Sequence, residues 1–298
     1  MSTAATPFDA ARVGLTRRLR GSMVVRGALG SWRARIGLGI VAVIVFVALC
    51  GRWLAPASQY AIAGMPLAGP SASHLLGTDF LGRDALSRFL NGGQVLVLVA
   101  FVATALAYLV GISVGMAAGY RRRAFDAVTV AVVDLFLAFP PIVFVLLLIA
   151  AAGPHLSLVV VAIAITHAPR IVRIVRTVTS EVATHEFVEA AVARGEPLRS
   201  ILRRDIFPNI LTPVLADFGL RLSGSVILFS SISYLGLGQG PPKSDWALMI
   251  SENRAGLLVQ PWLVIVPAAT IALLTIGVNL VADGIARSSG RYVENRGV

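Results

Sequence analysis

The sequence predicts an all-α membrane protein with six transmembrane helices and with both termini in the cytoplasm. The first observation is composition: 56% of the 298 residues are hydrophobic and only 14% are charged, whereas a soluble domain averages about 25% charged residues. The second is that the hydrophobic residues gather in six runs, and a helix needs about 20 mainly apolar residues to cross a bilayer. The third is that basic residues concentrate in every second segment between the runs, as cytoplasmic segments do.

Each apolar run is expected to be a helix, because none alternates apolar and polar residues as a barrel strand does. The fourth run is short, and we expect its helix to continue beyond Pro169 and out into water. The first run follows a long basic segment and exceeds an ordinary signal-peptide core, so we expect an uncleaved span. The six runs are 36–55, 95–118, 127–152, 156–169, 210–237 and 262–282.

Arginine placement gives the direction of the spans. Arginines cluster in the segment 1–35, at 121–123, within 170–204 and in the tail, and the other three connections hold few basic residues. All six spans therefore agree on one topology. We expect a cytoplasmic basic segment (1–35), a first transmembrane helix (36–55), an extracytoplasmic segment (56–94), a core of five spans (95–286) with a cytoplasmic loop at about 170–208, and a cytoplasmic tail (287–298).

Several functional classes are disfavoured by the charge and by the metal-binding residue types. The net charge of +11 comes from 26 basic residues, all arginine except Lys243. They stand in short blocks beside apolar runs, which fits a lipid bilayer as partner better than nucleic acid. Cys50 is the single cysteine, and the four histidines have no paired spacing. We therefore expect no disulfide within the chain and no metal site.

Two motif matches do not lead to catalysis. Gly111, Ser113 and Gly115 match the nucleophile elbow of hydrolases, which needs a strand-to-helix turn. Here they lie inside an apolar run, and glycines at 111, 115 and 119 instead predict a close approach of two helices. Lys243 follows Pro242 rather than the glycine of a phosphate-binding loop. ATP, if it drives this protein, is therefore expected to bind another polypeptide.

Ionisable side chains inside the apolar runs are costly and are candidates for function. Asp134 precedes Pro140, and Asp217 and Arg221 are spaced to pair on one helix face. Asp283 closes the sixth run. An ion-coupled carrier would use Asp134 or Asp217 as a relay. We favour the structural alternative, in which Asp217 and Arg221 neutralise each other near a helix end and Asp134 supports a helix break at Pro140.

Residues 170–208 form the most polar segment between two spans. A helix leaving the membrane is expected from residue 170, with an apolar stripe facing the bundle. A second helix is expected from Glu186 to about residue 194, ended by Gly195 in a left-handed cap. A third begins at Glu196 and Pro197 and is interrupted by Pro208. An interfacial helix held by anionic lipid, a cap on the bundle and a docking element for a soluble partner are all compatible with this pattern, and the rigid glycine corner favours docking.

This segment resembles the EAA loop of ABC-importer permeases. The resemblance rests on Glu189, Ala190 and Ala191, on Gly195 after three further residues, and on the string Ile206, Phe207 and Pro208. That loop inserts a short coupling helix into a cleft of an ATPase subunit. The resemblance therefore implies the same role for the residues Glu186, Phe187, Glu189, Ala190, Ala191, Gly195 and Pro208. Phe207 and Asp205 depart from residues that the family commonly has, but the spacing of Glu-Ala-Ala and glycine is intact.

Four further strings extend the resemblance to nearly the whole chain after residue 30, and they are similar to dipeptide and oligopeptide permeases. One is an external motif containing Gly77, Thr78, Asp79, Gly82, Arg83 and Asp84. The others are Asp134 with residues 137–140, residues 233–246, and Asn279 with Asp283 in the last span. The tail after residue 286 departs from the family pattern.

The resemblance implies the second permease of a peptide ABC importer, with a type I importer permease fold in a bacterial cell (inner) membrane. Its implied partners are a homologous permease that completes a heterodimer, two ATP-binding subunits that hold ATP and magnesium, and an extracytoplasmic substrate-binding protein. The chain itself is expected to be non-catalytic and to bind no cofactor. An ion-coupled secondary carrier for a small solute is the alternative.

Overall fold

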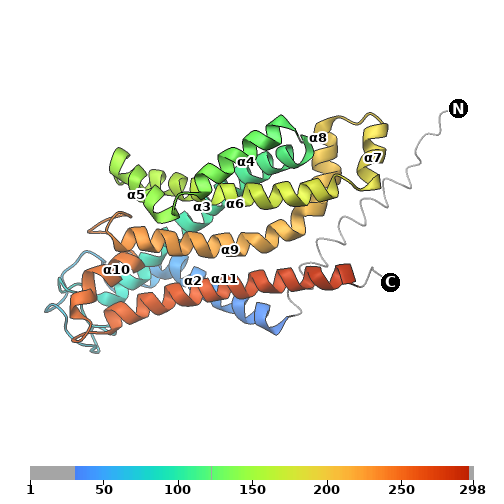
Figure 1. Cartoon of the computed structure of the whole chain (residues 1–298). Helices are drawn as coiled ribbons and strands as arrows, with labels where there is room; N and C mark the ends of the chain where they lie inside the picture. The colour runs from blue at the N-terminus through green and yellow to red at the C-terminus, as the bar shows by residue number, and fades with distance from the viewer. Residues whose placement is uncertain (1–30, 122, 295–298) are drawn as a thin grey trace.

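The computed structural model describes residues 31–121 and 123–294 (Figure 1). Within these ranges there is no strand, and extended pairing is limited to the isolated bridges Ile62–Arg83 and Thr78–Asp84. The helices in chain order are α2 (Trp32–Leu54), α3 (Ala85–Arg121), α4 (Ala124–Leu137), α5 (Pro141–Ala152), α6 (Leu156–Val182), α7 (Glu186–Ala193), α8 (Leu198–Ser200), η1 (Ile201–Ile206), α9 (Phe207–Tyr234), α10 (Trp246–Asn253), η2 (Arg254–Gly256) and α11 (Trp262–Glu294).

Among the described residues, five helical stretches are long and apolar enough to cross a membrane, and α4 with α5 makes a sixth if this bent pair is one span. The five are α2, α3, α6, the stretch from α8 to α9, and α11. The predicted third span, 127–152, is therefore not one straight helix, because α4 and α5 meet at 83°. Pro141 excludes a helical conformation at Pro140, which is extended at ψ 128°, and Pro141 then starts α5.

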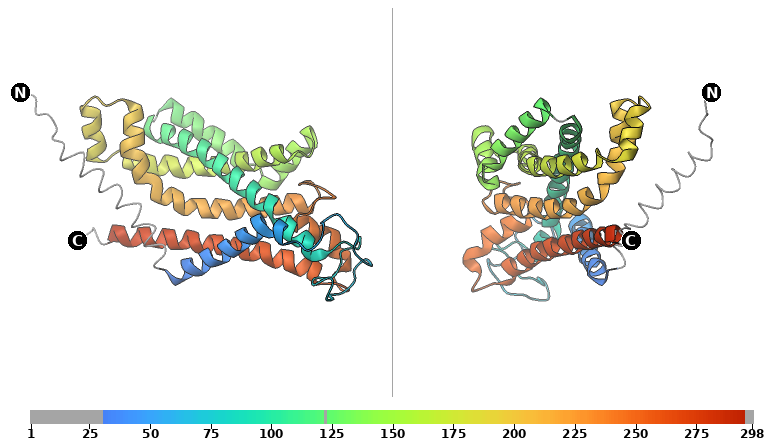
Figure 2. Two further views of the ribbon diagram at one scale, coloured as in Figure 1. Left: turned by 180° about the vertical axis from the view of Figure 1, so that it is seen from behind. Right: turned by 45° about the vertical axis from the view of Figure 1, so that its right-hand side comes forward.

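The long helices form a bundle with short elements at both ends (Figures 1 and 2). One end, called the α7 end below, holds α7, α8, the turn between α3 and α4, the start of α2 and the end of α11. The opposite end, called the α10 end, holds α10 and the loop between α2 and α3. Every second connection thus lies at the same end, in agreement with the alternation expected from arginine placement.

One predicted boundary is corrected by a helix cap, and another prediction is confirmed. α3 begins at Ala85 rather than at residue 95, because the Asp84 carboxylate accepts the Ser87 amide at 2.8 Å. The first turns of α3 therefore belong to the segment expected to be a loop. α6 runs through Pro169 to Val182, as predicted for the short fourth run.

The bundle core is divided between the two ends. Toward the α10 end, Leu96, Phe229 and Ile232 are fully buried in a cluster that includes Trp246. The Trp246 ring stacks on Phe89 at 5.4 Å, and its indole N–H donates to the Phe89 carbonyl at 2.8 Å. This contact fastens α10 to α3. Toward the α7 end, the core joins α3 and α6 to α7, η1 and α9 through Ile171, Val175, Val188, Ala191, Ile201, Ile206 and Ile210.

The predicted close approach of glycines is confirmed between α3 and α6. A Cβ on Gly111 would lie 2.5 Å from Ile171 Cγ2, and one on Gly119 would lie 2.5 Å from the Arg176 carbonyl oxygen. Ser113 lies inside α3 and donates to the Leu109 carbonyl at 2.7 Å. It is a helix residue with a satisfied hydroxyl and does not occupy a strand-to-helix turn.

Candidate functional site

A helix–turn–helix at the α7 end contains the residues expected to contact a motor. Gly195 has φ +72°, its amide donates to the Val192 carbonyl at 2.9 Å, and the Glu196 amide donates to the Ala191 carbonyl at 3.2 Å. These two bonds form the left-handed cap that ends a helix with a glycine. Nothing lies within 4 Å of a Cβ placed on Gly195. Glycine is therefore favoured at this position by the left-handed backbone conformation and not by a lack of space for a side chain.

α7 has an inner face and an outer face. Val188 and Ala191 are 2% and 0% exposed and pack on Ile201 and Ile206 of η1. The outer face presents Glu186, Phe187, Glu189 and Ala190. Of the residues expected to contact an ATPase, Ala191 therefore acts from inside by packing α7 onto the bundle.

Pro208 does not interrupt the third helix of this segment, contrary to the sequence prediction. It occupies the first turn of α9, where a missing amide donor is tolerated, and the helical stretch from Leu198 to Tyr234 continues through it. The six residues of η1 form a π-helix at this junction, and the chain turns there from α8 into α9 (Figure 1). A π segment is a recognised cause of a helix bend. The pattern of apolar residues in the sequence does not predict this π-helix.

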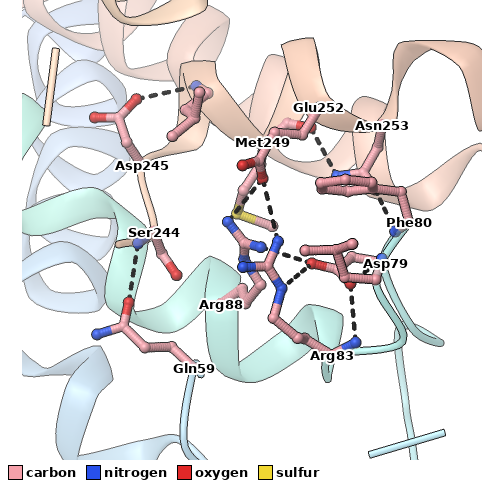
Figure 3. A network of polar contacts seen from close by, with 12 residues as sticks. Gln59, Asp79, Phe80, Arg83, Arg88, Ser244, Asp245, Met249, Glu252 and Asn253 are labelled. Atoms are coloured by element: carbon pink, nitrogen blue, oxygen red, sulfur yellow. Dashed lines mark hydrogen bonds and ion pairs between the residues drawn. The ribbon is translucent and has the colours of Figure 1, made fainter. Parts of the chain in front are cut away.

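At the α10 end, the external motif folds into a buried ionic network (Figure 3). The Asp79 carboxylate accepts Arg83 Nε at 2.7 Å and Arg88 Nη1 at 2.6 Å. Glu252 of α10 accepts Arg88 Nη2 at 2.8 Å and lies 3.5 Å from Arg83 Nη2. Two arginines thus balance two carboxylates, and the network joins the loop, α3 and α10 in one unit.

The remaining motif residues shape the loop around this network. Gly77 and Gly82 have φ +72° and +79°, and a Cβ on Gly82 would lie 2.2 Å from the Gly64 carbonyl oxygen. The Thr78 hydroxyl donates to the Met65 carbonyl at 2.5 Å. Asp84, besides capping α3, pairs with His74 Nδ1 at 2.9 Å. All six motif residues therefore serve one folded loop.

Sequence reasoning missed the partners of this loop on later elements. The Phe80 amide donates to Asn253 Oδ1 at 3.0 Å, and Gln260 Nε2 donates to the Ala68 carbonyl at 3.0 Å. Glu252 and Asn253 follow Trp246 on α10. A charged residue a few positions after a tryptophan was the one sequence feature that could have indicated Glu252 as a partner of the loop. Burial raises the pKa of Glu252 to about 7, against the lowering effect of the Arg83 charge.

α10 itself starts at a buried carboxylate. Asp245 accepts the amides of Ala247 and Leu248 at 2.9 and 3.2 Å, which caps the helix. It also accepts the Ser233 hydroxyl at 2.7 Å, which ties α10 to the end of α9. Burial raises the pKa of Asp245, while these three hydrogen bonds lower it.

Asp217, Arg221 and Asp134 are each paired, but they do not form one site. Asp217 and Arg221 pair at 2.9 Å as predicted, and Tyr108 of α3 also donates to Asp217 at 2.7 Å. The pair lies inside α9, not near a helix end as expected. Asp134 pairs with Arg173 of α6 at 2.5 Å. Its carboxylate therefore joins α4 to α6 and does not support the break at Pro140.

The last span contributes one polar contact and one exposed acid. Asn279 Oδ1 accepts the Ser223 hydroxyl of α9 at 3.0 Å, and Asp283 is exposed in the second half of α11. In residues 31–121 and 123–294, no three His, Cys, Asp or Glu side chains are grouped as metal ligands.

Comparison with known proteins assigns a family to this arrangement. Residues 107–293 match the family described as binding-protein-dependent transport system inner membrane component. The dipeptide transport system permease protein DppC of Alkalihalophilus pseudofirmus is 33% identical over 254 residues, which cover 85% of this chain and 83% of that protein. The glutathione transport system permease proteins GsiD of Escherichia coli and Pectobacterium atrosepticum are 33% and 32% identical, and each match covers 82% of both chains.

Among solved structures, the MetNI methionine ABC transporter in inward-facing conformations is 18% identical to this chain. The match covers 64% of this chain and 93% of that chain, with a TM-score of 0.49. The sequence matches are much closer and extend over most of the chain. This chain therefore belongs to the binding-protein-dependent transport system inner membrane components, the non-catalytic multi-pass permease subunits of ABC transporters.

Proposed function

We propose that this chain is the permease subunit of an ATP-driven importer of peptides. Relatives that match more than four-fifths of the chain are named as dipeptide and glutathione permeases, and glutathione is itself a tripeptide. In this proposal a second homologous permease pairs with the chain, and the two enclose the translocation path. A substrate-binding protein delivers the peptide outside the membrane.

The α7 end is proposed to face the cytoplasm and to contact the motor. One observation supports this most strongly: α7 is fixed to the bundle by Val188 and Ala191, while Glu186, Phe187 and Glu189 point outward. α7 also lies between two spans, α6 and the stretch that contains α9. Separate ATPase subunits would bind ATP and magnesium, and this chain would bind no cofactor.

Force applied to α7 has a direct route into the membrane. α6 runs from the α7 end through the bundle as one helix, and α9 is reached through η1. The close packing of α3 on α6 at Gly111 and Gly119 would carry a movement of α6 to α3. A shift of the motor between its ATP-bound and free states could thereby favour one arrangement of the spans over another.

Charge reversal on the outer face of α7 tests the proposal. Glu189→Lys should abolish both peptide uptake and co-purification of the ATPase subunits, while the protein remains in the membrane. Glu181→Lys is the matched control, because Glu181 is also an exposed acid but lies at the end of α6 before the turn. Normal uptake and normal ATPase recovery with Glu189→Lys would refute the assignment of α7 as the motor contact.

A further inference from the structure

Three arginines of the α7 end make no side-chain hydrogen bond and no ion pair within the part of the chain that the structure describes. They are Arg199 of α8 with Arg203 and Arg204 of η1, and all three are exposed. Other arginines near this end make ion pairs: Arg173 with Asp134 and Arg176 with Asp126. A cluster of such guanidinium groups beside paired ones indicates that its counter-charge comes from outside the part of the chain that the structure describes.

The cluster borders a hollow in the surface. The hollow has a volume of about 480 Å³ and is lined by Glu196, Pro197, Arg199, Ser200, Arg203 and Arg204. Ile201 and Ile206, on the other side of the same helix, are 2% and 0% exposed. Because the apolar side of this helical segment is buried in the core, the segment cannot rotate about its axis. The three arginines are therefore held beside the hollow.

The acid in the hollow does not neutralise the three arginines. The Glu196 carboxylate accepts Arg194 Nη2 at 2.7 Å and the Ser200 hydroxyl at 3.0 Å. Arg194 first and Ser200 second lower the pKa of Glu196, so this carboxylate is ionised and paired mainly with Arg194, and the Arg204 charge adds only a smaller lowering effect. The positive charge of the hollow therefore remains available. Planar guanidinium groups with several donors match the oxygen atoms of a phosphate group.

The position of the hollow favours a phosphate held at a membrane surface. Arg204 precedes Ile210, where the apolar run of α9 begins, by six residues, which is at most about 9 Å even for a straight α-helix. A headgroup layer extends roughly 5–8 Å beyond each side of the hydrocarbon core. α8 and η1 also lie between α7 and α9 (Figure 1). The arginines are thus nearer to the membrane surface than the proposed motor contact on α7.

We propose that Arg199, Arg203 and Arg204 form a binding site for a phosphate group, presented by the headgroup of an acidic phospholipid in the leaflet at the α7 end. An occupied site would hold α8 and η1 at the membrane surface while α7 engages the motor. The site uses residues distinct from the outer face of α7, so it can be tested separately from the proposed motor contact.

The test counts lipids bound to the full-length chain by native mass spectrometry. The chain is purified in mild detergent and offered phosphatidylglycerol or phosphatidylcholine with the same acyl chains. Wild-type protein should retain phosphatidylglycerol at least about tenfold better, as expected for several charge-assisted contacts to one phosphate. The variant Arg199→Gln/Arg203→Gln/Arg204→Gln should lose this preference. Arg17→Gln/Arg18→Gln/Arg20→Gln removes equal charge from the basic segment before the first span, and it should keep the preference.

A second arm separates the two sources of phosphate. If millimolar inorganic phosphate displaces the retained phosphatidylglycerol from wild-type protein, a free phosphate is sufficient for the site; if it does not, the lipid is the ligand.

The single variant Arg203→Gln, which should show a partial loss of phosphatidylglycerol retention, guards against misfolding of the triple variant. Equal retention of phosphatidylglycerol by wild-type, triple and single variants would overturn the proposal. So would a triple variant that keeps its lipid but loses co-purifying ATPase, because the arginines would then bind an acidic protein surface.

Discussion

Gly115 of α3 lies directly against Val175 of α6. A Cβ on Gly115 would stand 2.7 Å from Val175 Cβ and 2.9 Å from the Val172 carbonyl oxygen, closer than non-bonded atoms approach. Gly111 and Gly119 make equally close contacts one turn to either side. Small residues at this spacing allow two helix backbones to approach within a membrane, where packing rather than the hydrophobic effect drives association.

Gly115→Ala should therefore destabilise the protein. The added methyl group meets a backbone carbonyl and a β-branched side chain that cannot move aside, and such overpacking typically costs about 1–3 kcal/mol. The higher helix propensity of alanine returns less than about 1 kcal/mol. Thermal unfolding of the purified chain in detergent measures the loss. Gly39→Ala is the control, because nothing lies within 4 Å of a Cβ there. Equal melting temperatures for Gly115→Ala and Gly39→Ala would contradict this account.

The spacing of residues along the chain was sufficient to predict a close helix approach at these glycines, although not its partner, and local spacing predicts much of the fold. Glycines four residues apart predicted that another helix packs closely there, and the structure identifies it as α6. Arginine blocks predicted the alternation of the connections, and Gly195 predicted the end of α7. Each of these signals is local, since it depends on a helix repeat, on a loop or on one backbone conformation. Asp217 and Arg221 were likewise predicted to pair because both lie on one helix.

The features that the sequence did not predict depend on distant residues or on competing backbone bonds. Glu252 meets Arg88 across 164 positions, and no local pattern specifies that distance. The bend of 83° between α4 and α5 was not predicted either, since a proline pair fixes where a helix breaks but not the angle. The apolar residues of the sequence do not distinguish the π-helix of η1 from an α-helix. The interpretation of Pro208 as an interruption is wrong because proline is tolerated in the first turn of α9.

The stability of the α10 end should depend on pH through Glu252. Its pKa is about 7 in the folded protein, against an ordinary value of 4.5. Between these values the folded state binds the proton more tightly than the unfolded state, so protonation of Glu252 favours folding. Its contribution is therefore greatest below about pH 4.5 and declines as the pH rises to about 7, by up to about 1.4 kcal/mol per pH unit crossed.

Glu252→Gln isolates this effect, because glutamine cannot titrate and other groups contribute equally to both proteins. The difference in melting temperature between wild type and Glu252→Gln should change between pH 5 and 8, with wild type losing relative stability as the pH rises. A difference that stays constant over this range would show that Glu252 does not titrate there.

Removing only Asp217 from the Asp217–Arg221 pair of α9 should destabilise the protein strongly, whereas removing both charges together should destabilise it only slightly. Asp217→Ala leaves Arg221 and the Tyr108 hydroxyl without their shared acceptor. An unpaired charge in a low-dielectric setting typically costs about 3–5 kcal/mol. Asp217→Ala/Arg221→Leu should recover most of that loss, and Tyr108→Phe should cost only about 1 kcal/mol because the ion pair survives. Thermal unfolding of all three variants measures these differences.

The double variant also separates the two transport mechanisms. If Asp217 has a structural role, Asp217→Ala/Arg221→Leu should retain peptide uptake and its dependence on ATP. If the double variant is as unstable as Asp217→Ala, the pair does not act by charge neutralisation. If it is stable but transports nothing, Asp217 has a role in the path beyond pairing.

Gly195 should tolerate substitutions in the order asparagine, alanine, valine. Its φ of +72° is left-handed, a conformation that costs other L-residues about 1–2 kcal/mol, with asparagine the least affected. Space is free around it, so bulk alone should not set the order. Uptake and ATPase co-purification should fall in this order if the turn positions α7 for the motor.

Gly240 provides the control, with φ +68° and open space at the α10 end. The same three substitutions at Gly240 carry similar backbone strain but should leave ATPase recovery intact, and a matching loss there would mean that strain anywhere in the chain, and not the α7 turn, explains the result.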